Sequence, residues 1–490
     1  MTHDAVALYH ALAARDARFD GVFYVGVTST GIYCRPVCPA RTPRAANCRF
    51  FDSAESAEHA RFRPCLRCRP ELAPGNAPVD DARRVAQLLV QRIDEGMLDD
   101  GGGLEQVSAR FGWSSRQIRR VVQQELGVSP MELILTRRLL LAKQLLTETG
   151  LPVTEVAFAS GFASLRRFND AFSRRYGMPP TRLRAAASQA APTVPSSGSY
   201  TLRLAYRRPY DWAGVLDFLG ARALAGVERV EDGEYRRTVQ LGAHHGWVSV
   251  GDTPDRAVLR VELTSSLTPA LPALLGRLRH LFDLSARPDL IDAHLARDPA
   301  LADHVRARPG IRVPGAFDGF ELALRAILGQ QVSVAAATTL AGRVAAAFGT
   351  PVATPHAGLD RLSPTPARLA AATADELTAL GIVASRARCI IALAGAVARG
   401  EVRLEPGGDP DAAIAALVAL PGIGQWTAQY IAMRALRWPD AFPSEDLVVR
   451  RALGGLTPAR AAARSDGWRP WRGYATMHLW RSGLSRAGGG

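Results

Sequence analysis

The stretch of sequence that most restricts the fold lies near the end of the chain, at 420–428, and reads LPGIGQWTA. Its Pro-Gly-x-Gly turn ends one apolar helix and starts a second at once, and Gly422 and Gly424 let backbone N–H groups approach an anion at the second helix's N-terminus. We therefore expect a helical hairpin that holds a phosphate. Asp446 follows after one helix and a short proline-containing loop, which would return its carboxylate to the side of the bound group.

Three separated stretches in this half of the chain carry a family resemblance. LPGIGQWTAQYIAMRAL with FPSEDL resembles the helix-hairpin-helix and catalytic aspartate of the 3-methyladenine DNA glycosylase II (AlkA) family. FELALRAILGQQVSV at 320–334 and WRPWRGYATMHLW at 468–480 extend the likeness. The resemblance implies a glycosylase that hydrolyses the N-glycosidic bond of alkylated bases in double-stranded DNA, with Asp446 as the catalytic group. A carboxylate beside C1′ would stabilise the developing oxocarbenium ion and align water, and Glu445 and Asp440 are the local alternatives for that role.

The resemblance also implies where the flipped base would bind. Trp426, Tyr430 and Trp480 match the family's aromatic pocket positions, and Trp426 and Tyr430 share one helix face because they are four residues apart. Aromatic faces attract an extruded, positively charged purine by stacking and cation–π interaction. Core packing is the alternative for either residue taken alone. Gln331 aligns with the family's apolar wedge; glutamine can fill the gap and bond to the orphan base, but it inserts less favourably than leucine.

Strand cleavage is not expected from this half of the chain. Related hairpin enzymes that cut the strand carry a Schiff-base lysine two residues beyond the second hairpin glycine. That position is Trp426 here, and Lys143 is the only lysine in the chain. No cysteine follows Cys389, so an iron–sulfur loop is not expected either. The sequence thus predicts a monofunctional glycosylase that needs no cofactor.

Four cysteines near the N-terminus have the spacing of a metal site. Cys34-x3-Cys38 and Cys65-x2-Cys68 are two close pairs separated by a compact module, as one tetrahedral Zn²⁺ requires. Cys48 and Cys389 are expected to be ordinary buried thiols. The N-terminus lacks a basic region followed by an apolar core, so no secretory signal is expected, and a cytoplasmic, nucleoid-associated protein would keep these thiols reduced.

The sequence around these cysteines resembles the N-terminal domain of the Ada family of adaptive-response proteins. The stretches that carry the resemblance are FYVGVTSTGIYCRPVCPAR and FRPCLRCRP. The resemblance implies that the zinc-bound thiolate of Cys34 accepts a methyl group from a methylphosphotriester in DNA, once per molecule. The Pro-Cys-His-Arg motif of alkylguanine methyltransferases is missing, so O6-alkylguanine repair is not predicted. Eight arginines between Cys34 and Pro70 would hold a phosphate backbone against the thiolate: Arg35, Arg41, Arg44, Arg49, Arg61, Arg63, Arg67 and Arg69.

Between Val79 and about Arg184 apolar residues recur at helical spacing with two short breaks. GFASLRRFNDAFSRRYGMPPTRLR resembles the signature of AraC-type transcriptional regulators, whose two recognition helices enter successive turns of the major groove. The expected helix-turn-helix units comprise 104–111, 112–114 and 115–126, and then 153–160, 161–163 and 164–176. The candidates for base or phosphate contact are Gln117, Arg119, Arg120, Arg166, Arg167 and Asn169. A solvated helix face is the alternative for any single arginine.

The fold class that follows is a multidomain α+β protein. It comprises a small zinc domain (1–78), an all-α double helix-turn-helix (79–185), a linker (186–199), a small antiparallel-sheet domain (200–307) and an all-α helix-hairpin-helix core (308–490). The sheet domain is indicated by strand-like stretches at 201–206, 238–241, 247–250 and 257–263. Because the linker is small, polar and contains proline, we expect the two halves to be tethered rather than fused.

The net charge of +14 favours a polyanionic partner, and no apolar run is long enough for a membrane span. The expected partners are alkylated duplex DNA, methylphosphotriesters and promoter DNA, with RNA polymerase as a further candidate. The alternative is a DNA-binding regulator whose glycosylase half binds lesions without cutting them.

Overall fold

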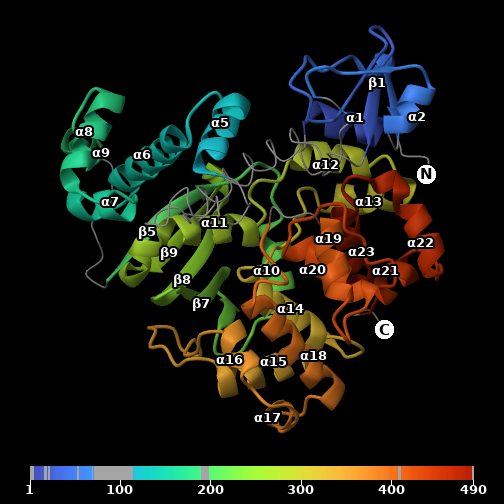
Figure 1. Ribbon diagram of the computed structural model, residues 1–490. Coiled ribbons are helices and arrows are strands. Elements are labelled where there is room, and N and C mark those ends of the chain that lie inside the picture. Colours follow the sequence, from blue (N-terminus) through green and yellow to red (C-terminus); the bar gives the residue numbers. More distant parts are fainter. Residues whose placement is uncertain are drawn as a thin grey trace.

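The computed structural model describes residues 5–15, 19, 23–51, 54–68, 70, 114–188, 198–406 and 410–487. It has the predicted multidomain α+β organisation, with a four-cysteine cluster, a helical region, a small antiparallel sheet and a helical core (Figure 1). The helix predicted at 104–111, and the turn residues Gly112 and Trp113, lie outside the described residues. Within the described ranges, no helix is both long and apolar enough to cross a membrane.

The N-terminal segment forms a four-stranded sheet in the order β3-β1-β2-β4. Strands β2 and β4 are parallel, with Tyr33 opposite Pro64, so Cys34 at the end of β2 comes beside Cys65, which directly follows β4. This pairing brings the two halves of the cysteine set together. The elements are α1 (Ala5–Ala13), β1 (Tyr24–Val27), β2 (Ile32–Cys34), η2 (Ala45–Asn47), β3 (Cys48–Phe51), α2 (Ala54–His59) and β4 (Arg63–Pro64).

The regulator-like segment is helical in the described part. Ser114 and Gln117 form a capping box at the start of α5, and the Ser164 hydroxyl caps α8, so both expected recognition helices begin at a serine. Gly161 takes a positive φ in the turn between α7 and α8. The helices are α5 (Ser115–Leu126), α6 (Pro130–Glu148), α7 (Val153–Ala159), α8 (Leu165–Tyr176) and α9 (Pro180–Ser188).

An antiparallel sheet in the order β5-β9-β8-β7-β6 follows. The four expected strands are present, and β6 is an additional one. Its sequence is charged, but it is joined to β7 through Asp232 and Gly233, which both have positive φ, and an Asp-Gly pair of this kind is a strong hairpin signal. The elements are β5 (Ser199–Ala205), α10 (Trp212–Gly220), β6 (Glu228–Glu231), β7 (Glu234–Leu241), β8 (His244–Thr253), η4 (Pro254–Arg256), β9 (Val258–Thr264) and η5 (Ser265–Ala270).

The expectation that the two halves are merely tethered is wrong for this structure. The Gln144 side chain of α6 donates to the carbonyl oxygen of Arg203 in β5 at 2.8 Å, and the Arg203 N–H donates to Glu148 at 2.9 Å. Buried residues of α6 to α8 also belong to the same apolar core as the sheet, and α7 lies beside β5 (Figure 1). On the other side of the molecule, His10 of α1 lies 3.1 Å from the guanidinium of Arg297. The linker's composition could not reveal these contacts, because they depend on helix faces remote from it.

The remainder of the chain is almost entirely helical and includes the hairpin that joins α19 to α20 (Figure 1). The helices are α11 (Leu271–Leu281), α12 (Pro288–Leu295), α13 (Pro299–Ala307), α14 (Gly319–Leu328), α15 (Val334–Phe348), α16 (Pro366–Ala370), α17 (Ala374–Thr378), α18 (Ala384–Ala398), α19 (Pro410–Val418), α20 (Gln425–Arg434), α21 (Leu447–Ala452), α22 (Pro458–Arg464), η6 (Ser465–Trp468) and α23 (Arg472–Ala487).

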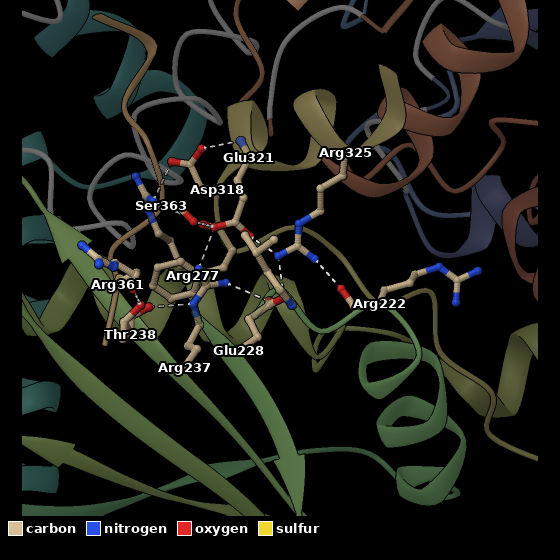
Figure 2. A network of polar contacts seen from close by, with 12 residues as sticks. Arg222, Glu228, Arg237, Thr238, Arg277, Asp318, Glu321, Arg325, Arg361 and Ser363 are labelled. Atoms are coloured by element: carbon tan, nitrogen blue, oxygen red, sulfur yellow. Dashed lines mark hydrogen bonds and ion pairs between the residues drawn. The ribbon is translucent and has the colours of Figure 1, made fainter. Parts of the chain in front are cut away.

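A buried ion-pair network joins the sheet domain to the helical core (Figure 2). Arg237 of β7 contacts Glu321 of α14 at 2.9 Å and Glu228 of β6 at 3.4 Å. Arg325 of α14 contacts the same two carboxylates at 2.7 and 2.5 Å, and also donates to the carbonyl oxygen of Arg222 at 3.0 Å. Charges buried this deeply require mutual compensation. The network therefore fixes how the sheet domain sits against α14.

Glu321→Gln should destabilise the protein by about 3–5 kcal/mol, because two buried guanidinium groups would then share only Glu228. Burial raises the pKa of Glu321, but Arg237 and Arg325 outweigh it and hold that pKa at about 2. Since the folded-state pKa lies below the unfolded value of about 4.3, the stabilisation is complete above that value and is lost as the pH falls toward 2.

Urea unfolding across a pH series measures this difference. The gap between wild type and Glu321→Gln should be constant near neutrality and shrink below about pH 4. The exposed Glu445, changed to Gln, is the control and should leave stability almost unaltered. A gap that stays constant down to the lowest pH would contradict the assigned role of Glu321.

Candidate active site and metal centre

The Asp446 carboxylate lies buried where three helices of the core meet. It is the N-cap of α21, and its Oδ1 accepts from the Val449 N–H at 2.9 Å. The same oxygen accepts from the indole N–H of Trp480 on α23 at 3.1 Å, and Oδ2 accepts from the indole N–H of Trp426 on α20 at 2.9 Å. Both oxygens are thus held by N–H donors, which fix the plane and position of the carboxylate.

Trp426 and Trp480, whose indoles bond to this carboxylate, both lie next to Tyr430, the third predicted pocket aromatic. Trp426 stacks on Tyr430 with ring centroids 5.4 Å apart and an interplanar angle of 11°. Tyr430 lies 6.1 Å from Trp480 at a tilt of 45°. Phe218 of α10, in the sheet domain, stacks on Trp480 with ring centroids 6.3 Å apart. The sheet domain therefore adds one aromatic wall to a cluster otherwise built by the helical core.

Two guanidinium groups, those of Arg434 and Arg222, contact the aromatic cluster. Arg434 of α20 is buried, donates to the Tyr430 hydroxyl at 2.7 Å and lies 4.8 Å from the Phe218 ring centroid. Arg222 lies 3.9 Å from the centroid of the same Phe218 ring. Burial alone would raise the pKa of Tyr430, but the positive charges of Arg434 and Arg222 outweigh it and lower that pKa below its ordinary value.

The two alternative carboxylates are placed differently. Glu445 is exposed. Asp440 is buried but accepts from Arg472 at 2.8 Å and from Arg469, so its charge is already paired. Asp446 is the carboxylate that bonds to Trp426 and Trp480, and its catalytic role stays a prediction.

The hairpin turn leaves the N-terminus of α20 without a side-chain cap. Gly422 has a φ of +91°, and a Cβ there would lie 3.1 Å from Cys389. Gly424 is the N-cap of α20, no side chain caps it, and a Cβ there would meet nothing within 4 Å. First-turn N–H groups of α20 are thereby open to an anion. Gln331 is exposed at the turn between α14 and α15, as a wedge would have to be.

The four predicted metal ligands also come together. The sulfurs of Cys34, Cys38, Cys65 and Cys68 all lie within 4.8 Å of one another, and all four residues are buried. A tetrahedral Zn²⁺ with bonds of about 2.3 Å needs sulfurs about 3.8 Å apart, so the set fits that ion. The backbone N–H of Arg35 points to the Cys68 sulfur at 3.5 Å. Cys48 lies outside the cluster, and its thiol donates to the carbonyl oxygen of Arg44.

Four family models match the chain in order. They are the metal binding domain of Ada at residues 7–71, a helix-turn-helix domain at 107–186, the AlkA N-terminal domain at 201–318, and the HhH-GPD superfamily base excision DNA repair protein at 324–466. The probable bifunctional transcriptional activator/DNA repair enzyme AlkA of Mycobacterium tuberculosis is 41% identical over 487 residues, which cover 98% of this chain and 97% of the relative. The chain belongs to the family of these AlkA/Ada-type bifunctional proteins.

Two further likenesses cover the AlkA-like half. DNA-3-methyladenine glycosylase 2 of Escherichia coli is 39% identical over 289 residues, 57% of this chain and 96% of that protein. The solved structure of 3-methyladenine DNA-glycosylase from Archaeoglobus fulgidus has a TM-score of 0.51 at 22% identity, covering 58% of this chain and 98% of the other. The second likeness supports the fold alone.

The AlkA-type chain presents most of its predicted DNA-contact residues to solvent. Arg119 and Arg120 of α5 are exposed, as are Arg166 and Arg167 of α8, whereas Asn169 is half-buried. Gln117 is also exposed, but its carbonyl oxygen accepts from the Ser114 N–H at 2.8 Å. A base contact by Gln117 would therefore use its NH₂ group or give up the capping box.

The sequence-based prediction missed Phe218, Arg222 and Arg434, which contact the aromatic cluster or one another. Arg434 could have been found, because it continues the four-residue spacing of Trp426 and Tyr430 on one helix face. Phe218 and Arg222 belong to the other domain of the AlkA-type half and have no local motif. They reach the aromatic cluster because α10 packs against α23, where Phe218 stacks on Trp480 and Arg481 donates to the carbonyl oxygen of Gly214.

Proposed function

We propose that the C-terminal half is a monofunctional DNA glycosylase that releases alkylated bases of the 3-methyladenine type by hydrolysis. The observation that carries this proposal is the Asp446 carboxylate held between Trp426 and Trp480. The 39% identical relative named DNA-3-methyladenine glycosylase 2 supports the substrate class. Trp426 occupies the position of a lyase lysine, and Lys143 is the only lysine, so the proposal includes no strand cleavage and no cofactor for this half.

The proposed mechanism uses two features of the site: aromatic rings that bind the flipped base, and the negative charge of Asp446. A flipped, cationic base is held against the faces of Trp426, Tyr430 and Trp480 by stacking and cation–π attraction. As the glycosidic bond lengthens, the base leaves with the bonding electrons and the sugar becomes an oxocarbenium ion. The fixed Asp446 carboxylate stabilises that ion, and water adds to C1′. The hairpin N–H groups would bind the flanking phosphate. Gln331 would fill the space that the flipped base leaves in the stack.

The N-terminal half, we propose, is a sensor and transcription regulator. One Zn²⁺ held by Cys34, Cys38, Cys65 and Cys68 would keep the Cys34 sulfur as a thiolate. That sulfur attacks the methyl carbon of a methylphosphotriester: the S–C bond forms, the C–O bond breaks, and the phosphodiester leaves as an anion. The helix-turn-helix units would then read promoter DNA on the nucleoid, with RNA polymerase as the partner of an activator.

Asp446→Asn should lower the rate of 3-methyladenine release from methylated duplex DNA about a hundredfold or more, because the charge that stabilises the transition state is lost. Chromatography of freed bases under single-turnover conditions measures it. Glu445→Gln, a change to the exposed neighbour, should keep the rate. Full activity in Asp446→Asn would remove Asp446 from the catalytic role, and a completely inactive wild type would favour the lesion-binding regulator instead.

Zinc-loaded protein incubated with DNA that contains methylphosphotriesters should gain the mass of a single methyl group, located on Cys34 by peptide fragmentation. Metal analysis of the same sample should give one zinc ion per chain. Cys48→Ser is the control and should react like the wild type, since Cys48 lies outside the cluster. A methyl group on another cysteine, or none on folded, zinc-loaded protein, would contradict the assignment.

A further inference from the structure

The turn between α14 and α15 carries two consecutive glutamines in different surroundings. Gln331 is exposed and has a φ of +55°, a conformation that a residue with a Cβ keeps only where its neighbours enforce it. Gln330 is half-buried. The candidate wedge, Gln331, thus has a strained backbone conformation. Gln330 directly precedes it in the turn.

Gln330 joins this turn to the hairpin through its side chain. Its Nε2 donates to the carbonyl oxygen of Gly422 at 2.9 Å and to the hydroxyl of Thr427 at 3.1 Å. Thr427 is buried on α20, one residue after Trp426. A single amide therefore contacts both the hairpin turn and the helix that carries the aromatic wall.

Helix α18 contacts both the turn with Gln330 and the hairpin turn with Gly422. Arg386 donates to the backbone carbonyl oxygen of Gln330. Cys389, one turn further along, lies directly under Gly422, where an added Cβ would be 3.1 Å from the Cys389 Cβ. One face of α18 thus contacts both the glutamine turn and the hairpin turn, and Gln330 closes the gap between them.

We propose that Gln330 is a positioning residue that couples insertion of Gln331 into the duplex to the phosphate grip of the hairpin. Extruding a nucleotide costs stacking and pairing energy, which a wedge offsets only if it enters the stack while the extruded nucleotide is held. A turn free to move relative to the hairpin would have to be ordered first, and that cost would reduce the benefit. This inference rests on the proposed glycosylase function.

Gln330→Met tests the coupling, because methionine has similar length and volume but no amide donor. The probes are two duplexes with the same alkylated purine, one opposite its normal partner and one opposite an abasic site, where extrusion costs less. Gln330→Met should slow single-turnover excision from the paired duplex about tenfold and leave excision opposite the abasic site nearly unchanged. Asp446→Asn, the matched chemical variant, should slow both equally.

A 2-aminopurine beside the lesion gives a second readout, since its fluorescence rises when the neighbouring nucleotide leaves the stack. That rise should be slower in Gln330→Met and unaltered in Asp446→Asn. If Gln330→Met fails to fold, Thr427→Val removes one of the two acceptors and should give the same pattern with a smaller loss.

Equal losses on the two duplexes, or none on either, would overturn the coupling while the glycosylase function stands. Absence of excision by the unaltered protein on both duplexes would instead contradict the proposed function itself.

Discussion

The structure of the candidate active site depends on one buried carboxylate and its three N–H donors. Asp446 receives hydrogen bonds from the indoles of Trp426 and Trp480 and from the Val449 backbone. A buried charge is tolerated only with such partners, so α20, α21 and α23 must all be in place before the carboxylate can be buried. The two indoles that satisfy it are also walls of the aromatic cluster. The group proposed to stabilise the transition state and the surface proposed to bind the base are therefore positioned by the same side chains.

The rest of the AlkA-type half keeps this arrangement aligned with a duplex. The ion-pair network of Arg237, Glu321, Arg325 and Glu228 fixes the sheet domain against α14, and that domain supplies Phe218. Next to the end of α14, Gln330 links the turn with Gln331 to the hairpin. The proposed base pocket, the wedge candidate and the proposed phosphate site thus belong to one continuous set of contacts. The zinc domain and the helix-turn-helix segment contact this half as well, through His10 and through Gln144 and Glu148.

Features that have a short sequence motif could be predicted from the sequence. The hairpin, Asp446, the aromatic residues and the cysteine set each have a short motif, and the structure brings their members together. Features that depend on distant segments could not be predicted: Phe218 reaches the pocket only through domain packing, and Gln330 meets Gly422 only in the folded core. The docking of α6 on β5 was missed because linker composition says nothing about helix faces. Strand β6 was missed although its Asp-Gly turn could have indicated it.

The most direct test of how the indoles position Asp446 replaces each indole by a phenyl ring. Trp426→Phe and Trp480→Phe keep an aromatic face for the base but remove the donor to Asp446, and Trp247→Phe in β8 is the matched control. Each of the two pocket variants should lower the saturating single-turnover excision rate about tenfold or more, while affinity for alkylated DNA changes less than about twofold, and the control should behave like the wild type. Full excision rates in both pocket variants, or losses of affinity as large as the losses of rate, would contradict the claim that the indoles position the catalytic carboxylate.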